Sequence, residues 1–348
     1  MIASIAFRNF KALRNARIQL ERFNLVIGPN GSGKSSLIES LMRLRTLARL
    51  PLSDLPVALE RHGVGPEVSF HFFPPFDGWE AVMMCATEHH CDLLQAIPLP
   101  AGGGIEDWPT LRERLLRIRR YEFDHTAIGR PSLLKDGHEL SIDGGNLAAV
   151  LARWQDSAPA AFNGWRSDVL RTLPEYDDIG VIKSAGGRAS LRFSLVDHGE
   201  SITGEELSQG SLYALAIFAL ACDPDPPAMV CIEELDRGLH PRLLREARDA
   251  LYRLSYPETA GLSRAPVQVI ATTYSPYLLD LFRDHPEEVV IAQKHGRVAH
   301  FTRLCERSDL GELMAGASLG DLWYSGILGG VPDEAGGGSS PKAEPAKP

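Results

Sequence analysis

Eight consecutive residues near the N-terminus have the composition of a phosphate-binding loop. Residues 28–35 read G-P-N-G-S-G-K-S and fit the spacing G-x-x-x-x-G-K-S in full. Glycines let the main chain curl so that consecutive N–H groups point at phosphate oxygens, and a following helix adds its positive dipole end. The residues expected to bind phosphate here are Gly28, Asn30, Gly31, Ser32, Gly33, Lys34, Ser35 and Ser36. Lys34 is expected to reach the β- and γ-phosphates, and the Ser35 hydroxyl to bind Mg²⁺.

A pair of carboxylates farther along the chain could act on Mg²⁺ and on water. The apolar residues 229–232 lead directly into Glu233 and Glu234. One acid at the end of a buried strand can orient the Mg²⁺ shell, and its neighbour can polarise a water for attack on the γ-phosphate. We therefore expect Glu233 to be a metal ligand and Glu234 to be catalytic. A strand ending in two acids is weak evidence by itself, but the phosphate loop upstream makes it strong.

A third segment, residues 207–210, reads L-S-Q-G and precedes an apolar helical run over residues 212–222. A serine hydroxyl and a glycine at a helix N-terminus form a further anion site. Ser208 and Gly210 are therefore candidate phosphate ligands. Their separation in sequence from residues 28–35 indicates that they are not redundant with the first loop.

The elements that must position these residues predict an α/β protein. Residues 2–27 are expected to form a β meander whose last strand, residues 24–27, runs into the phosphate loop, and residues 36–42 continue as a helix. After residue 207 strands and helices alternate. The predicted helices there are 212–222, 241–254 and 277–282, and the predicted strands are 229–232, 267–272 and 289–292.

The chain is predicted to divide into a nucleotide-binding core and an inserted arm. The core comprises residues 1–45 and 200–330, the α/β arm residues 46–199, and a disordered tail residues 331–348. Pro51 and Pro56 break the helical pattern after the phosphate loop, so the chain is expected to leave the core there. Within the arm we expect a hairpin of strands 67–73 and 80–87, a strand at 118–123, helices at 146–154 and 161–173, and strands at 179–182 and 189–195.

Composition narrows the class of protein. The chain has 348 residues, a formal net charge of −9 and 44% hydrophobic residues, which is typical of a globular protein and argues against a uniformly basic nucleic-acid wrapper. A local basic face could still meet phosphate, although a solvated helix face is favoured; its residues are Arg112, Arg114, Arg117, Arg119 and Arg120. The sequence shows no leader and no apolar run of about 18 residues, so we expect a cytoplasmic protein without a membrane segment.

The cysteines predict reduced thiols. Cys85, Cys91, Cys222, Cys231 and Cys305 form no C-x-x-C pair. Cys85 and Cys91, with two histidines between them, offer potential metal ligands. Their crowding within a short stretch makes tetrahedral closure awkward, so a metal site is disfavoured.

These motifs together resemble those of a known family. The set comprises residues 9–11 (N-F-K), 28–35, 207–210, 232–241 (I-E-E-L-D-R-G-L-H-P) and 272–276 (T-T-Y-S-P). It is similar to the ABC-type ATPases of the SMC/RecF/OLD group, especially the small stand-alone bacterial predicted ATPases, which residues 318–323 and 326–330 also resemble. The resemblance implies a P-loop NTPase fold of ABC-ATPase type, with a mixed central sheet and flanking helices, that hydrolyses ATP with Mg²⁺.

The resemblance also implies that a second copy of the chain completes the ATP site. In this family the signature loop of one subunit, here residues 207–210, caps ATP held by the phosphate loop of another. Ser208 and Gly210 would then act in trans in a homodimer that sandwiches two ATP molecules. Lys11 would approach the phosphates, although a solvated strand residue is an equally supported interpretation.

Two residues depart from the family pattern. Tyr274 stands where the family usually has a histidine that contacts the γ-phosphate and helps to hold the attacking water. Tyrosine can donate a hydrogen bond, but it is larger and does not titrate near neutrality, so slow hydrolysis or a displaced Tyr274 is expected. Leu235 stands where a proline commonly follows the two acids. No glutamine for a lid loop on Mg²⁺ can be assigned within residues 50–100.

Three functions follow as hypotheses. The leading one is an ATP-binding and hydrolysing dimeric switch in DNA maintenance or phage defence, with a separate effector protein and with DNA as a possible partner. The second is a weakly hydrolysing nucleotide sensor that regulates a partner protein, motivated by Tyr274. The third is the ATPase subunit of a membrane transporter, which residues 9–11, residues 239–241 and the long arm disfavour.

Overall fold

The computed structural model describes residues 1–52, 65–99, 107–196, 199–296 and 298–329. The predicted disordered tail, residues 331–348, and the predicted break at Pro56 lie outside the described residues. The described strands form three sheets, of six, five and four strands. No helix within the described ranges is long and apolar enough to cross a membrane.

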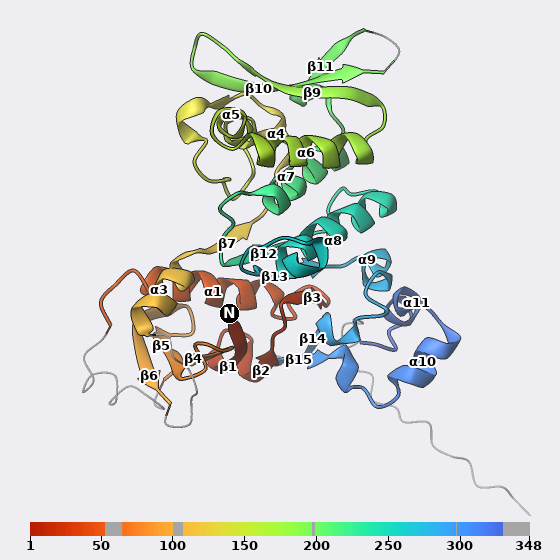
Figure 1. Cartoon of the computed structure of the whole chain (residues 1–348). Coiled ribbons are helices and arrows are strands. Elements are labelled where there is room, and N and C mark those ends of the chain that lie inside the picture. The colour runs from red at the N-terminus through yellow and green to blue at the C-terminus, as the bar shows by residue number, and fades with distance from the viewer. Residues whose placement is uncertain (53–64, 100–106, 197–198, 297, 330–348) are drawn as a thin grey trace, which may run out of the picture.

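The six-stranded sheet is the centre of the lower body in Figure 1. Its strands, in spatial order, are β15 (Val298–Arg303), β14 (Val289–His295), β3 (Phe23–Ile27), β13 (Gln268–Thr273), β12 (Met229–Ile232) and β7 (Ile118–Tyr121). β15 pairs antiparallel with β14, and the other pairs are parallel. Because side chains alternate along a strand, Val26 enters one buried core while Leu25 and Ile27 enter the other. The predicted mixed central sheet is confirmed.

A five-stranded antiparallel sheet lies beneath the central one. Its order is β2 (Leu13–Gln19), β1 (Ile2–Phe10), β4 (Glu67–Phe72), β5 (Trp79–Thr87) and β6 (His90–Pro98). Helix α1 (Lys34–Leu47) packs between the two sheets, because Leu37, Leu41 and Leu44 are buried in the same core as Phe7 of β1. Helix α3 (Trp108–Leu116) adds Leu111 and Leu115 to this core. The phosphate loop is therefore anchored on both sides by packed elements.

Helices cover the opposite face of the central sheet. They are α7 (Gln209–Cys222), α8 (Pro241–Ser255), α9 (Pro276–Asp280), α10 (Leu310–Gly316) and α11 (Leu319–Tyr324). α7 is buried along almost its whole length because it lies between α8 and the upper lobe. α8 buries only one face, with Leu244, Leu251 and Leu254 inward and arginines outward.

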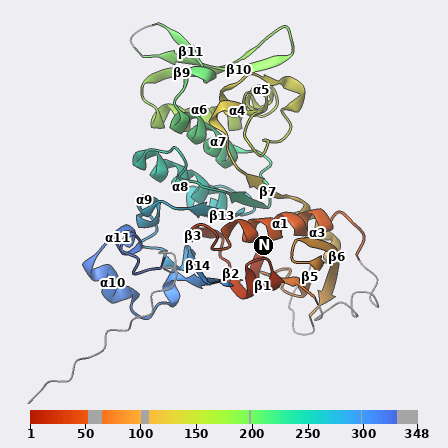
Figure 2. The same ribbon diagram turned by 180° about the vertical axis from the view of Figure 1, so that it is seen from behind.

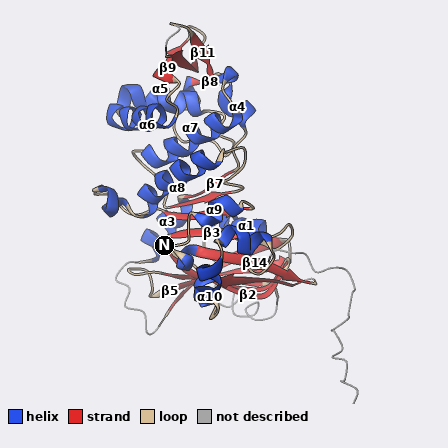
Figure 3. Cartoon of the chain, turned by 90° about the vertical axis from the view of Figure 1, so that its right-hand side faces the viewer, coloured by secondary structure: helices blue, strands red, loops and turns tan. Residues whose placement is uncertain are grey.

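The upper lobe is formed by residues 125–196 and 199–203, which are called the arm below, and is seen from behind in Figure 2. It contains α4 (His125–Gly129), α5 (Leu147–Ser157), α6 (Pro159–Thr172) and a sheet of β8 (Ser132–Leu133), β9 (Tyr176–Lys183), β10 (Arg188–Leu195) and β11 (Ser201–Thr203). Figure 3 shows this sheet at the opposite end of the molecule from β2 and β5, with α5, α6, α7 and α8 between them. The buried Trp165 of α6 joins the arm to α7 by donating Nε1–H to the carbonyl of Leu215, at 3.0 Å.

Parts of the segment predicted as an arm belong to the core sheets. β4, β5 and β6 extend the sheet of β1, and β7 pairs in parallel with β12. The predicted hairpin of β4 and β5 is correct, but the other edge of β4 pairs with the N-terminal strand β1, a partnership that the local pattern does not encode. Strand β3 also leaves the predicted N-terminal meander for the central sheet, because both of its faces are apolar and need two cores.

The cysteine prediction is wrong for one pair. Cys85 of β5 and Cys91 of β6 form a disulfide. The two strands form a hairpin in which these cysteines are directly opposite each other. Cys222, Cys231 and Cys305 are free thiols. No cluster of three or more metal-ligating side chains occurs in the part of the chain that the structure describes.

Candidate nucleotide-binding site

The phosphate loop connects the end of β3 to the start of α1, as the sequence predicts. Gly28 lies so close to β14 that a Cβ there would be 2.3 Å from the carbonyl oxygen of Ala292, which excludes any side chain. Gly31 and Gly33 have φ angles of 74° and 97°, a left-handed conformation that glycine adopts without a steric cost. The glycines thus allow both the close packing and the curl of the loop.

The N-terminus of α1 fits a phosphate group. Gly33 is its N-cap and provides no side-chain hydrogen bond, so no side chain competes for the first amides of the helix. Ser32 is buried, and its Oγ has no hydrogen-bond partner among the described residues. The Ser32 hydroxyl and the first N–H groups of α1 are hydrogen-bond donors that can bind anionic oxygens. Ser36 lies half-buried in the first turn.

Lys34 folds back over the loop. Its Nζ donates to the carbonyl oxygens of Gly28, at 2.6 Å, and Pro29, at 3.0 Å, and it lies 4.1 Å from the centre of the Tyr274 ring. Burial lowers the pKa of Lys34 to about 8, although the nearby carboxylates of Glu234, Asp236 and Glu233 oppose that change. The Lys34 ammonium group thus contacts neutral groups here, two carbonyl oxygens and an aromatic ring. A phosphate can replace the two carbonyl oxygens as its hydrogen-bond acceptor.

The predicted metal ligands Ser35 and Glu233 lie together. Ser35 Oγ donates to Glu233 Oε2 at 3.1 Å, although the two residues are 198 positions apart in sequence. β12 is parallel to β3 through β13, so its carboxyl end reaches the start of α1. A hydroxyl and a carboxylate are oxygen ligands that suit Mg²⁺. Glu233 also forms an ion pair with Arg120 of β7, whose Nε lies 2.7 Å from Oε1.

Glu234, the predicted catalytic residue, has a strained backbone. Its φ is 51°, a left-handed conformation that is uncommon for residues other than glycine. Thr272 of β13 holds it there, because Oγ1 accepts from the N–H of Glu234 at 3.0 Å and the Thr272 carbonyl accepts from the N–H of Leu235 at 2.9 Å. The Glu234 side chain is exposed, its Oε2 lies 4.0 Å from Nε of Arg237, and its charge acts on Lys34 and Tyr274.

Tyr274 lies at the site and is not displaced from it. Its hydroxyl donates to Oδ1 of Asn30 in the phosphate loop at 2.6 Å, and its ring covers Lys34. Partial burial, together with the charges of Glu234, Asp236 and Glu233, raises the pKa of Tyr274. Asp236 supports the segment by accepting from Thr273 Oγ1 at 2.6 Å. Tyr274 therefore has a neutral hydroxyl that bridges the loop and β13.

Lys11 has another partner. It lies in the turn between β1 and β2 with a φ of 54°, so it is not the strand residue that one interpretation expected. Its ammonium group forms an ion pair with Glu39, one turn beyond Ser35 on α1. Lys11 thus lies beside α1, next to the phosphate loop, and none of the hydrogen bonds or ion pairs of the described residues joins it to that loop.

Ser208 and Gly210 lie apart from the phosphate loop. Ser208 is the N-cap of α7, where its Oγ accepts from the N–H of Ser211 at 3.2 Å. Gly210 packs against the segment after Glu234, since a Cβ there would be 2.7 Å from the carbonyl oxygen of Gly238. Within the described ranges no hydrogen bond or ion pair connects either residue to residues 28–35. One chain by itself therefore does not bring the two anion sites together.

Sequence reasoning missed three contributors to the site, Arg120, Thr272 and Asp236. Thr272 and Asp236 lie inside the segments that carry the family resemblance, so the sequence points to both residues. It does not predict their hydrogen bonds, because these depend on the pairing of β12 with β13. Arg120 is one of the arginines for which the sequence favours a solvated helix face. It lies on β7, and its contact with Glu233 depends on the parallel pairing of β7 and β12. The sequence signal that could have placed Arg120 on a strand is the alternation of side chains along the predicted strand at 118–123.

Comparisons with known proteins agree with this fold. Residues 108–280 match the family model described as "AAA domain, putative AbiEii toxin, Type IV TA system", and residues 1–62 match the one described as "AAA ATPase domain". An SMC head solved with the C-winged helix domain of ScpA has a TM-score of 0.56 at 15% identity, over 86% of this chain and 96% of that chain. No curated protein gave a significant match.

A second solved structure supports the same fold. It is an SMC head domain with an extended coiled coil bound to the C-terminal domain of ScpA, derived from Pyrococcus furiosus, with a TM-score of 0.56 at 13% identity, over 90% of this chain and 99% of that chain. Such likenesses establish the P-loop NTPase fold of an SMC head. The two AAA family matches, this fold and the phosphate loop between β3 and α1 support an SMC/RecF-like ABC-type ATPase.

Proposed function

We propose that this chain is an ATP-driven switch, in which two copies sandwich two ATP molecules with Mg²⁺ and part after hydrolysis. The convergence of residues from three strand ends carries the proposal. Ser35 lies 3.1 Å from Glu233, and Lys34 lies 4.1 Å from the ring of Tyr274. Phosphoryl transfer depends mainly on positioning and charge stabilisation, which these residues can supply.

Each residue of the site has a role in this proposal. Lys34 exchanges the carbonyls of Gly28 and Pro29 for phosphate oxygens. Ser35 and Glu233 would hold Mg²⁺, which supplies neutralisation of the charge on the β- and γ-phosphates. Glu234 orients a water for in-line attack and accepts its proton. Asn30 and the hydroxyl of Tyr274 border the place where the γ-phosphate would lie.

The proposed dimer explains why Ser208 lies apart from residues 28–35. The Ser208 hydroxyl at the start of α7 is exposed, and a nucleotide on another copy would compete with the Ser211 N–H for it. Contacts that require the γ-phosphate would favour the closed dimer, and their loss on hydrolysis would release it.

Light scattering tests the dimer. Glu234→Gln removes the base but keeps the side-chain length, so this variant is expected to accumulate as a dimer with ATP and Mg²⁺. Without nucleotide it is expected to be a monomer. Lys34→Ala in the same background serves as the control and is expected to stay monomeric. A Glu234→Gln protein that binds ATP and remains monomeric would refute the sandwich.

A role in phage defence with a separate effector protein is the cellular setting that we propose for the switch. The match of residues 108–280 to the model described as "putative AbiEii toxin, Type IV TA system" supports it over DNA maintenance. A phage plating assay is the test. Expression with the neighbouring genes is expected to lower plating efficiency, and Lys34→Ala to restore it; equal plating with both proteins would speak against this setting.

A weakly hydrolysing nucleotide sensor is the second candidate, and the contact of Tyr274 with Lys34 favours it. An aromatic ring over an ammonium group stabilises it by about 0.5 to 2 kcal/mol, which a nucleotide must overcome. Tyr274→His removes this ring and supplies a group that titrates near neutrality. Phosphate release is expected to increase about ten-fold or more. No increase would leave the slow step unrelated to Tyr274 and count against the sensor.

A further inference from the structure

A second concave site lies on the side of α1 away from the phosphate loop. It is a cavity of about 810 Å³ between the C-terminal half of α1, β7 and residues 139–143 of the arm. Its charged lining consists of Arg45, Arg49, Arg119, Arg120, Glu139 and Asp143. The lining has four guanidinium groups and two carboxylates, in a chain whose net charge is −9. Arg120 also pairs with Glu122 and Glu233, which lie outside the lining. The excess positive charge therefore lies on Arg45 of α1 and on Arg49 just beyond it.

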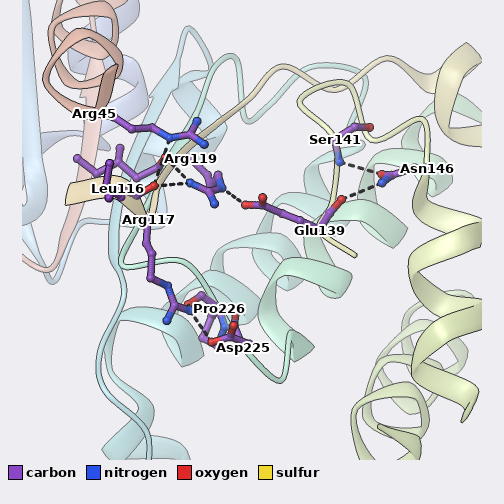
Figure 4. A network of polar contacts seen from close by, with 10 residues as sticks. Arg45, Leu116, Arg117, Arg119, Glu139, Ser141, Asn146, Asp225 and Pro226 are labelled. Carbon is purple, nitrogen blue, oxygen red and sulfur yellow. Dashed lines mark hydrogen bonds and ion pairs between the residues drawn. The ribbon is translucent and has the colours of Figure 1, made fainter. Parts of the chain in front are cut away.

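Neutral carbonyls accept hydrogen bonds from two of these arginines, Arg45 and Arg119, as Figure 4 shows. Arg45 Nε donates to the carbonyl of Leu116 at 3.3 Å, and Arg119 Nη1 donates to the same carbonyl at 2.8 Å. Carbonyls fix the geometry of the guanidinium groups without neutralising them. Glu139 is the acid that pairs with Arg119, and it comes from the arm.

The arginines repel one another. Burial lowers the pKa of Arg45, and the charge of Arg49 adds to the effect. Burial also lowers the pKa of Arg119, followed by the charge of Arg45. Packing like charges together is unfavourable for the fold alone, and an anion between them would offset the repulsion.

A neighbouring cavity is lined by arginines and acids in equal numbers. This cavity, of about 460 Å³, shares Arg119 and Glu139 with the first. Arg117 there forms an ion pair with Asp225 and donates to the carbonyl of Pro226 at 2.6 Å, and Arg153 contacts the ring of His138. None of the ion pairs of the described residues joins Arg45 or Arg49 to an acid, so the excess positive charge of the cavity beside α1 lies on these two residues. The Arg119–Glu139 pair forms the wall between the two.

We propose that the arginine-lined cavity beside α1 binds the phosphate groups of a small phosphorylated ligand, separate from ATP at residues 28–35. Arginine suits phosphate because its planar fork forms two parallel hydrogen bonds. The recessed position favours a small ligand over a nucleic-acid duplex, since only 19% of the Arg119 side chain is exposed. Phosphate drawn to Arg119 would displace Glu139, which ties the arm to the core.

The cavity also reaches the magnesium site. Arg120 lines it and at the same time pairs with Glu233, at 2.7 Å. An anion in the cavity competes with Glu233 for Arg120 and leaves the Glu233 carboxylate more available to Mg²⁺. The ligand is therefore an activator of the nucleotide site in this proposal, and an empty cavity favours the paired, less available Glu233.

Calorimetric titration with inorganic pyrophosphate tests the cavity. The Lys34→Ala protein serves as the background because it weakens the phosphate loop. Arg45→Gln with Arg49→Gln is expected to weaken pyrophosphate binding about ten-fold, since two charge-assisted contacts are lost and glutamine keeps the helix. The matched control, Arg17→Gln with Arg245→Gln, removes the same charge from exposed positions elsewhere and is expected to change nothing. Equal weakening in both would overturn the proposal.

Glu139→Gln supplies the reverse test, which misfolding cannot imitate. Removal of the carboxylate that competes for Arg119 is expected to tighten pyrophosphate binding about three-fold. Unchanged or weaker binding would overturn the proposal. A duplex oligonucleotide is titrated in parallel. If the duplex binds through Arg45 and Arg49 while pyrophosphate does not, the cavity serves nucleic acid and the small-ligand proposal is wrong.

Discussion

The helix N-termini of α1 and α7 both combine serine with glycine, but they differ in how their first amides are used. At α1 the N-cap is Gly33, with a φ of 97° and no side-chain hydrogen bond. At α7 the N-cap is Ser208, which accepts from the N–H of Ser211 and contacts its hydroxyl at 2.8 Å. The first terminus is open to phosphate within one chain. The second is closed by its own cap.

This difference suggests a division of labour. The α1 terminus, with Lys34 and Ser35, is proposed to bind a nucleotide in a monomer. The α7 terminus is kept in shape by Ser208 and by Gly210, which packs on the carbonyl of Gly238. Gly238 follows Glu234 by four residues, so the second terminus is braced against the segment that carries the proposed base. Nucleotide binding and dimer closure should therefore be separable by mutation.

The largest expected effect is at α1. Lys34→Ala removes the ammonium group that bonds to Gly28 and Pro29, and with it the charge that would meet the phosphates. ATP affinity is expected to fall about 100-fold, because charge-assisted contacts in a buried site are lost. Fluorescence titration with a labelled ATP measures it. An affinity within a few-fold of wild type would show that the loop is not the nucleotide site.

The α7 terminus is expected to affect dimerisation alone. Ser208→Asp keeps a good N-cap but places a negative charge where a phosphate is proposed to bind. In the Glu234→Gln background this variant is expected to bind ATP with unchanged affinity as a monomer and to dimerise at least about ten-fold more weakly. Ser208→Asn, which caps without a charge, is the control. Equal dimerisation of the Asp and Asn variants would place Ser208 outside the interface.

The parts of the site that the sequence predicted are formed by residues contiguous in the chain. Residues 28–35 form a single turn of chain between a strand and a helix, so their order alone describes their geometry. Glu233 and Glu234 follow a run of four apolar residues and lie at a strand end for the same reason. The proximity of Ser35 and Glu233 also followed, because parallel strands end at one edge of a sheet.

The sequence did not predict which strands pair with one another in the sheets. The strand at β7 was expected, yet its place beside β12 depends on pairing across more than 100 residues, so Arg120 was not connected with Glu233. Likewise the contact of Lys11 with Glu39 depends on how β1 and β2 lie against α1. The cavity beside α1 combines the core with the arm and has no sequence motif at all.

We expect pH to have a smaller effect, on ATP binding at the α1 terminus and not on the α7 terminus. Lys34 has a pKa lowered to about 8, so it is charged below that pH and loses its proton above it. Phosphate needs the charged form, so ATP affinity should be full below pH 8 and fall about ten-fold by pH 9. Titration at pH 7, 8 and 9 measures it, with Lys34→Arg, charged throughout, as the control. A constant wild-type affinity would contradict the lowered pKa.

The smallest expected effect concerns Glu234, on the segment that connects the two termini. Its φ of 51° is costly for glutamate and free for glycine. Glu234→Gly is therefore expected to raise the free energy of unfolding by about 1 kcal/mol and the melting temperature by roughly 2 °C, while hydrolysis is lost. Glu234→Gln keeps the Cβ and should melt like wild type. If both variants melt alike, the segment between the two termini stores no strain, and Thr272 positions Glu234 without a cost in stability.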